Sequence, residues 1–260
     1  MADVVDLSLA IDDRALEPSL SSLAQAMDDV IQRVNRGPTE DAPGEITRAA
    51  VELLGRATWA SVTMLEKGKF RSLSPTAEAA MTADQLQYEL GSGPCVDAVL
   101  DDGIYVTGDI AADGRWPAYG HRVQEEVGVW SMAAYRLAVP EDLGVIAGLN
   151  LYSVEPDAFD EQSVWLGLLL ATHASLAVSA QLAHEEVGNL QQALQSNRDI
   201  GVAIGVLMAR HGLTRDQAFD LLRVASQDRN RKLVDIAADV AESGELAISH
   251  WPKSGRQNAL

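Results

Sequence analysis

The residues best suited to chemistry form one short basic run near the C-terminal end, Arg229-Asn230-Arg231-Lys232. A guanidinium pairs with phosphate through two parallel donors and stacks on flat rings, whereas a lysine adds a point charge. An asparagine amide suits base edges, but it also suits the cap of a helix. Asn197 and Arg198 repeat this pairing of amide and guanidinium earlier in the chain. Such a run taken alone is more often a solvated face than a binding site.

Other reactive side chains show no catalytic or metal-binding pattern. Cys95 is the single cysteine, and sulfoxide reduction needs a second thiol to resolve the oxidised one. We therefore interpret Cys95 as a small core thiol. The five histidines have no metal-ligand spacing, and no Gly-rich phosphate loop or nucleophile elbow occurs. We predict no catalytic residue, no metal and no cofactor.

Charge divides the chain into two unequal parts. The net charge of the whole chain is −18. Residues 188–260 contain nine Lys/Arg and eight Asp/Glu, whereas residues 1–187 contain 11 Lys/Arg and 30 Asp/Glu. The acidic part repels nucleic acid, and the near-neutral part does not. A single cysteine, no signal peptide and no long apolar stretch indicate a cytoplasmic protein without a membrane partner.

The elements that must position the basic run are short helices. Thr214 and Gln217 form a capping-box pattern after a stop signal at Gly212. Asn230 is placed to cap a third helix, which ends before Gly244. The basic run therefore enters the third helix of a small bundle.

Upstream, alternating and helical patterns predict an α+β domain, an antiparallel sheet flanked by helices. The predicted strands are Trp59–Glu66, Lys69–Leu73, Ile104–Val106, Val129–Val139 and Val145–Tyr152. The predicted helices are Pro18–Arg36, Ile46–Leu54, a short run at Leu86–Tyr88, Cys95–Leu100 and Trp116–Val127, with a linker at Gly37–Gly44.

A long connecting helix is predicted from a cap at Asp160 toward Arg210. Apolar residues along it alternate four and three apart, which is the spacing of a coiled-coil seam. The seam residues are Val187, Leu190, Leu194, Ile204 and Met208. The same pattern also describes a helix that is buried within one chain, but we favour a parallel homodimer.

The C-terminal segment resembles the ANTAR domain, a three-helix RNA-binding module of bacterial transcription antitermination regulators. The matching residues are Asn189, Leu190, Ala193, Leu194, Ser196-Asn197-Arg198, Ile200-Gly201, Ala203, Gly205-Val206-Leu207-Met208-Ala209, Ala218-Phe219, Leu221-Leu222, Ser226-Gln227, Asn230, Lys232-Leu233 and Asp235-Ile236-Ala237. Many ANTAR domains have lysine at Ile204 and arginine at Val234, so two positive charges are missing from this chain.

The upstream part resembles the GAF sensor domain that is joined to ANTAR in actinobacterial proteins. The matching residues are Ala60-Ser61-Val62-Thr63, Gly93-Pro94-Cys95, Asp109, Arg115-Trp116-Pro117, Gly148-Leu149-Asn150-Leu151-Tyr152 and Phe159. A GAF pocket would be lined by Cys95, Trp116, Tyr119, Trp130 and Tyr135, although these residues equally suit a core that is poor in Phe. Its ligand is a small molecule or protein of unknown kind.

The resemblance implies binding to paired stem-loops in nascent transcripts, which prevents the terminator hairpin from forming. The expected RNA contacts are Asn197, Arg198, Arg229, Asn230, Arg231 and Lys232. The expected organisation is a mobile acidic arm (1–17), a GAF-like domain with an N-terminal helix (18–182), an ANTAR domain (183–245) and a tail (246–260). One rival is a protein-interaction or stress-signalling module, and a weaker rival is a GAF-type redox enzyme.

Overall fold

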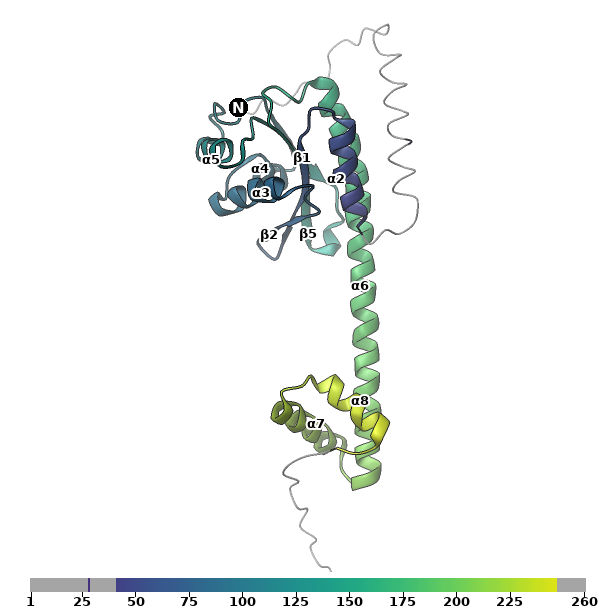
Figure 1. Cartoon of the computed structure of the whole chain (residues 1–260). Coiled ribbons are helices and arrows are strands. Elements are labelled where there is room, and N and C mark those ends of the chain that lie inside the picture. Colours follow the sequence, from purple (N-terminus) through teal and green to yellow (C-terminus); the bar gives the residue numbers. More distant parts are fainter. Residues whose placement is uncertain (1–27, 29–40, 247–260) are drawn as a thin grey trace, which may run out of the picture. The chain divides into compact units, whose positions relative to one another are not determined.

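The computed structural model describes residue 28 and residues 41–246, which fall into two compact units (Figure 1). The first unit ends at Ala183 and the second begins at His184, and each has its own apolar core. The predicted arm 1–17, nearly all of the tail and the predicted helix Pro18–Arg36 lie outside the described residues, except that Asp28 is helical.

The first unit is built on one five-stranded sheet in the order β2-β1-β5-β4-β3, with every neighbouring pair antiparallel. The strands are β1 (Trp59–Glu66), β2 (Lys69–Leu73), β3 (Ile104–Thr107), β4 (Ser131–Leu137) and β5 (Val145–Ser153). The predicted α+β fold is confirmed. β1 and β2 have the predicted bounds because Lys67 and Gly68 both adopt a positive φ, which makes the turn tight.

Helices cover both faces of the sheet (Figure 1). One face packs against α3 (Glu78–Leu90), α4 (Pro94–Asp101) and α5 (Pro117–Val127), and the other against α2 (Ala42–Leu53) and the first part of α6 (Glu161–His211). Strand residues divide by period two between the faces, as Met132 and Ala134 face α3–α5 whereas Ala133 and Tyr135 face α2 and α6.

Two helices, α2 and α3, differ in their bounds from the prediction because of their caps. The linker prediction is wrong at its end, because α2 already begins at Ala42. The Asp41 carboxylate accepts the Gly44 N–H at 3.0 Å, and Pro43 lies in the first turn, where no N–H is needed. The short run predicted at Leu86–Tyr88 belongs to the longer α3, which ends at Gly91 with φ +60°.

The long helix α6 begins as predicted, with the Asp160 carboxylate accepting the Ser163 N–H at 2.8 Å. By length and composition it is the one helix among the described residues that is apolar enough to cross a membrane. Its apolar residues Leu166, Leu170, Ala174 and Val178 are buried against the sheet, so we interpret this part as a core helix.

The second unit packs the end of α6 against α7 (Arg215–Arg229) and α8 (Leu233–Ser243). The predicted capping box is confirmed, since the Thr214 hydroxyl accepts the Gln217 N–H and the Gln217 side chain accepts the Thr214 N–H. The predicted end of the third helix is also confirmed, because Gly244 closes α8 in the left-handed conformation. The core of this unit consists of Ala203, Ile204, Leu207, Ala218, Leu222, Ala225, Ile236, Ala237 and Val240.

Candidate nucleic-acid interface and sensor core

The basic run occupies the turn between α7 and α8, and hydrogen bonds fix its backbone. Asn230 closes α7 in the left-handed conformation, with φ 50°, which asparagine tolerates better than most residues. The Arg231 N–H donates to the Ser226 carbonyl at 3.1 Å, and the Ser226 hydroxyl donates to the Arg231 carbonyl at 2.6 Å. The side chains of Arg231 and Lys232 therefore extend from a defined turn rather than from a loose loop. We call residues 229–232 the basic corner.

Asn230 does not have its predicted capping role. It lies at the C-cap of α7, whereas the N-cap position of α8 belongs to Lys232. The prediction was wrong because the turn needs a left-handed residue, and a helix N-cap has a different backbone conformation. No side-chain hydrogen bond caps the start of α8, and its first N–H group with a backbone partner is that of Asp235, which donates to the Lys232 carbonyl at 3.1 Å. The N–H groups of Leu233 and Val234 come before it and directly follow the basic corner in the chain.

Asp239 pairs with Arg231 of the basic corner. The Arg231 guanidinium donates to the Asp239 carboxylate at 2.6 Å, and both side chains are about half exposed. This hydrogen bond, together with the charge of Arg229, holds the pKa of Asp239 below its ordinary value. A phosphate that binds Arg231 must therefore compete with this carboxylate.

The other two predicted RNA contacts lie on α6. Asn197 and Arg198 are both exposed. Leu207, in the core of the second unit, comes about two and a half turns after Arg198, so the two side chains point to opposite sides of α6. In the described part of the chain, no hydrogen bond or ion pair joins Asn197 or Arg198 to the basic corner.

The five residues predicted to line a pocket in the first unit do not lie together. Cys95, Trp116 and Tyr119 are buried in the cluster beneath α3, α4 and α5. Tyr135 is buried on the opposite face of the sheet, and Trp130 is 41% exposed. The pocket prediction is corrected in this respect, because strand alternation sends Tyr135 away from the other aromatic residues. The buried members fill core space, which was the alternative interpretation.

The sequence did not reveal a buried polar network centred on Asp84 of α3. Asp84 is fully buried and accepts hydrogen bonds from Ser72 at 2.6 Å, Ser61 at 2.9 Å, Asn150 at 3.0 Å and the hydroxyl of Tyr152. Four donors from three strands therefore converge on one carboxylate. No positive charge is among them.

The network extends from Asp84 toward α4. Thr63 accepts from the Asn150 amide at 2.9 Å and shares a hydrogen bond with the Tyr88 hydroxyl at 2.6 Å. The Gln87 side chain accepts the Cys95 N–H at 2.8 Å, which ties the start of α4 to α3. Within the described residues, the Asn150 side-chain oxygen is buried without a hydrogen-bond partner.

Burial controls the ionisation of this network. Loss of water raises the pKa of Asp84 to about 6, against the opposing effect of its hydroxyl and amide donors. Burial, followed by the charge of Asp84, raises the pKa of the Cys95 thiol to about 12.

One feature of the sequence does indicate this buried polar network. Ser61 with Thr63 and Asn150 with Tyr152 are polar pairs at period two on strands that are otherwise apolar, and Ser61 lies opposite Asn150.

Comparison with protein families assigns both units. The ANTAR domain model matches residues 188–240, and the GAF domain model matches residues 40–179. The chain is a GAF–ANTAR protein. A sensor domain followed by an output domain is the architecture of a signal-controlled regulator. No curated protein matches the chain.

Several solved structures are similar to the GAF domain of this GAF–ANTAR protein. A free methionine-R-sulfoxide reductase from Neisseria meningitidis has a TM-score of 0.45 and 15% identity, covering 68% of this chain and 96% of that one. A protein described as a GAF sensor from Burkholderia vietnamiensis has a TM-score of 0.48 and 15% identity, with coverage of 63% and 98%. The GAF domain of a phosphotransferase from Coxiella burnetii has a TM-score of 0.48 and 18% identity, with coverage of 65% and 98%.

The environment of Cys95 in the GAF domain does not suit a nucleophile. The thiol is fully buried, and its raised pKa keeps it protonated at neutral pH. Thiol chemistry requires an accessible thiolate. Cys95 therefore acts as a packing residue in this conformation of the domain.

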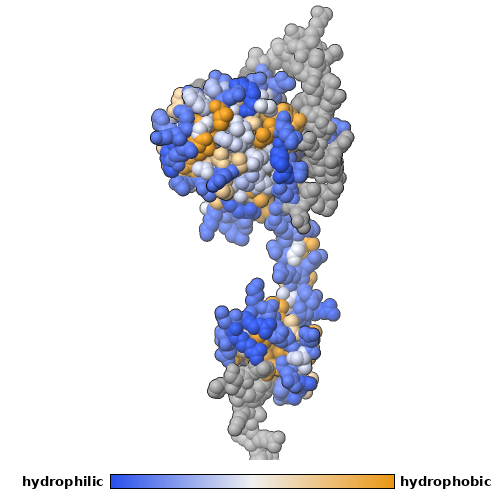
Figure 2. Space-filling model, viewed as in Figure 1, coloured by the Kyte–Doolittle hydropathy of each residue, from blue (hydrophilic) through white to orange (hydrophobic). Residues whose placement is uncertain are grey.

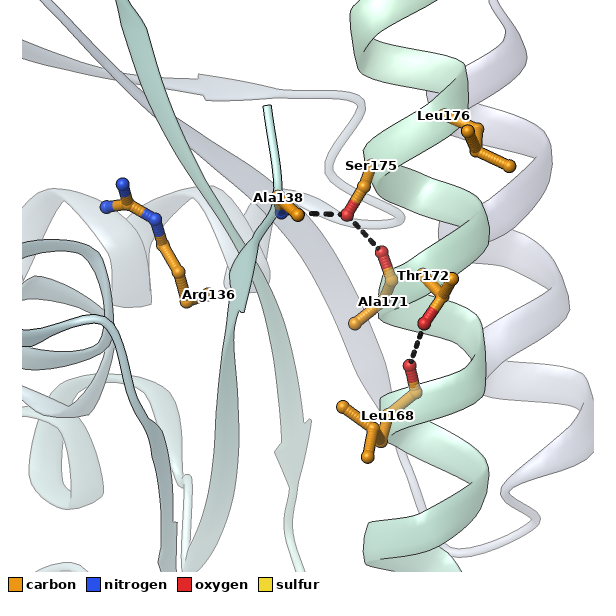
Figure 3. A pocket seen from close by; sticks show the side chains of 7 residues that line it. All are labelled: Arg136, Ala138, Leu168, Ala171, Thr172, Ser175 and Leu176. Carbon is orange, nitrogen blue, oxygen red and sulfur yellow. Dashed lines mark hydrogen bonds between the residues drawn. The ribbon is translucent and has the colours of Figure 1, made fainter. Parts of the chain in front are cut away.

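A shallow groove on the GAF domain lies between the end of β4 and α6 (Figure 3). It has a volume of about 260 Å³ and is largely apolar, with Leu168, Ala171 and Leu176 among its lining residues. The Ser175 hydroxyl accepts the Ala138 N–H at 3.0 Å and so holds the end of β4 against α6. Leu176 borders the groove and is 67% exposed.

Part of the predicted dimer seam is free on the surface of α6. Val187, Leu190 and Leu194 are more than half exposed and Met208 is 37% exposed, and Figure 2 shows apolar patches along this helix. Ile204 is buried in the core of the ANTAR domain, so its prediction as a seam residue is wrong. The heptad pattern cannot distinguish a residue that faces a partner from one that faces α7 and α8.

Proposed function

We propose that this GAF–ANTAR protein binds paired stem-loops in nascent mRNA and thereby prevents formation of the terminator hairpin. The ANTAR domain makes the RNA contacts, and a small-molecule or protein signal at the GAF domain controls them. The protein then works in the cytoplasm, where transcripts are made. The basic corner is the observation that carries this proposal.

The corner combines three features that suit a phosphate backbone. Arg231 and Lys232 are exposed, their backbone is fixed by the Ser226 hydrogen bonds, and the uncapped start of α8 adds N–H donors. The surrounding segment is near neutral, whereas the GAF domain is strongly acidic. RNA is therefore attracted to the ANTAR domain and repelled elsewhere.

Two linked hairpins suit a dimeric reader, because the second contact becomes intramolecular once the first has formed. We propose a homodimer that pairs through α6. Trp165 and Leu176 are exposed on α6 in the first unit and lie 11 residues apart, which places them on one side of the helix. Leu176 protrudes beside the groove, and a protruding side chain next to a groove suits a self-complementary twofold interface. In the second unit, α6 exposes Val187, Leu190 and Leu194.

A salt titration of RNA binding tests the role of the corner. RNA crosslinked to the protein in cells is sequenced, and the enriched hairpin pair becomes the probe. We expect Arg231→Ala to weaken binding and to flatten the dependence of log K on log salt by about one unit. Asp239→Asn is the matched variant. It removes the competing carboxylate, so we expect it to strengthen binding.

Three outcomes would contradict the proposal at different points. If no RNA is enriched above an uncrosslinked control, the proposed function fails, and a protein enriched instead would support the interaction-module alternative. If RNA binds but Arg231→Ala keeps the parent affinity and salt slope, the corner is not the contact. If Asp239→Asn weakens RNA binding, the Asp239 carboxylate does not compete with phosphate for Arg231.

A further inference from the structure

An aromatic side chain lies exposed on the ANTAR domain. Phe219 of α7 is 41% exposed, whereas its helix neighbours Ala218, Leu222 and Ala225 are buried in the core. A single exposed apolar residue is ordinary on a protein surface. The flanking residues of Phe219, however, are of a particular kind.

Arginines lie one turn before and one turn after this ring. Arg215 and Arg223 are four residues away on either side, and side chains at this spacing are neighbours on a helix surface. Arg223 donates to Asp220 at 3.1 Å, with both side chains more than half exposed. An exposed pair of this kind contributes little energy, so the guanidinium can exchange Asp220 for a phosphate. Within the described residues, no ion pair engages Arg215.

The ring belongs to a stripe that leads into the basic corner. Phe219, Arg223 and Ser226 follow one another at steps of four and three, which keeps them on one side of α7, and the C-cap residue Asn230 comes one turn after Ser226. Ser226 also holds the Arg231 carbonyl through its hydroxyl. The exposed ring with its flanking arginines and the basic corner are therefore two ends of one surface.

We propose that Phe219 is a stacking platform for one unpaired base of an RNA loop, with Arg215 and Arg223 holding the phosphates beside it. Every base has a flat face that stacks on an aromatic ring, whereas the faces of paired bases are hidden within a duplex. The ring therefore selects loops over stems without reading their sequence. This inference rests on the proposed RNA-binding function and adds a contact to it.

The test compares two RNAs with four forms of the full-length protein. One RNA is a hairpin pair selected by the parent protein from a pool with randomised loops, and the other has the same stems closed as blunt duplexes. The variants are Phe219→Ala, Phe219→Trp and the control Val224→Ala, which alters another exposed apolar residue of α7. Circular dichroism shows whether each variant remains folded. Affinity, salt slope and the fluorescence of 2-aminopurine placed in the loop are measured.

We expect Phe219→Ala to weaken hairpin binding by at least about fivefold, since loss of one base stack has an effect of this size or greater. The salt slope stays unchanged, because a stacking contact releases no counterion. Phe219→Trp and Val224→Ala keep the parent affinity, and duplex binding is equal in all forms. Quenching of the loop fluorophore on binding is lost only in Phe219→Ala.

The possible failures are distinct. If the parent protein selects no hairpin, both the RNA function and the stacking contact are wrong. If the parent binds and Phe219→Ala binds equally well with the same quenching, only the stacking contact is wrong. If Phe219→Ala weakens the binding of duplex and hairpin to the same extent, the ring is not a platform for an unpaired base.

Discussion

At the scale of single residues, burial gives the GAF domain a carboxyl group with unusual acid–base behaviour. Asp84 has no positive neighbour in its network, and its pKa is raised from 3.8 to about 6 because burial disfavours the charge. The folded state therefore binds this proton more tightly than the unfolded state does. The stabilising effect is fully present below about pH 4 and is lost as the pH rises through about 6.

Asp84→Asn should remove this pH dependence. A shift of this size corresponds to a loss on the order of 3 kcal/mol between acid and neutral pH. We expect the free energy of unfolding of the parent to fall relative to that of the variant from about pH 4 to pH 7. The free energy of unfolding is measured at each pH by urea unfolding of the full chain, monitored by tryptophan fluorescence. Glu125→Gln, a change at an exposed position, is the control, and its free energy of unfolding should change with pH as that of the parent does. Parallel curves for Asp84→Asn would show that its pKa is not raised.

At the scale of elements, the turn between α7 and α8 depends on a left-handed residue at Asn230. Glycine adopts this conformation without strain, whereas a β-branched residue does not. We expect Asn230→Gly to keep the turn and Asn230→Val to destabilise it by about 1–2 kcal/mol. Hydrogen exchange at the amides of α7 and α8 measures the difference locally.

The same pair of variants separates two roles of the asparagine. If the Asn230 amide reads a base edge, Asn230→Gly weakens RNA binding while the exchange protection of α8 is unchanged. If the residue serves only the turn, Asn230→Gly keeps the parent affinity. Equal protection in the glycine and valine variants would contradict the requirement for a left-handed residue.

At the scale of the whole molecule, the exposed stripe on α6 makes pairing of two copies testable. Leu190 and Leu194 are each at least 60% exposed. Burying a leucine stabilises an interface by about 1.5–3 kcal/mol, and a buried carboxylate would oppose it. We expect the double change Leu190→Glu and Leu194→Glu to give a monomer by light scattering. Gln192→Glu is the control, because Gln192 lies on the opposite side of the helix.

The monomeric variant should also bind RNA differently. It should keep its affinity for a single hairpin. It should lose the additional affinity that the dimer has for two linked hairpins, because the second contact is no longer intramolecular. A double variant that remains dimeric would show that the stripe is not the interface. A monomer that keeps the full gain would show that pairing does not serve RNA recognition.

Much of the fold could be predicted because the patterns are local. The strand Trp59–Glu66 ends at the turn signal Lys67-Gly68, and Thr214 with Gln217 satisfies the start of a helix within four residues. The basic corner could also be found from the sequence, since charged residues stay exposed almost wherever the chain folds. These features depend on neighbours along the chain and not on distant contacts.

The tertiary structure decided what each exposed or buried face meets. Asp84 looks like any helical acid until α3 packs on the sheet, where donors from three strands surround it. Ile204 fits the seam period, but it faces the ANTAR core because α7 and α8 cover that side of α6. Periodicity fixes which residues share a side of an element. Only packing fixes what lies against that side, because the contacting residues come from distant parts of the chain.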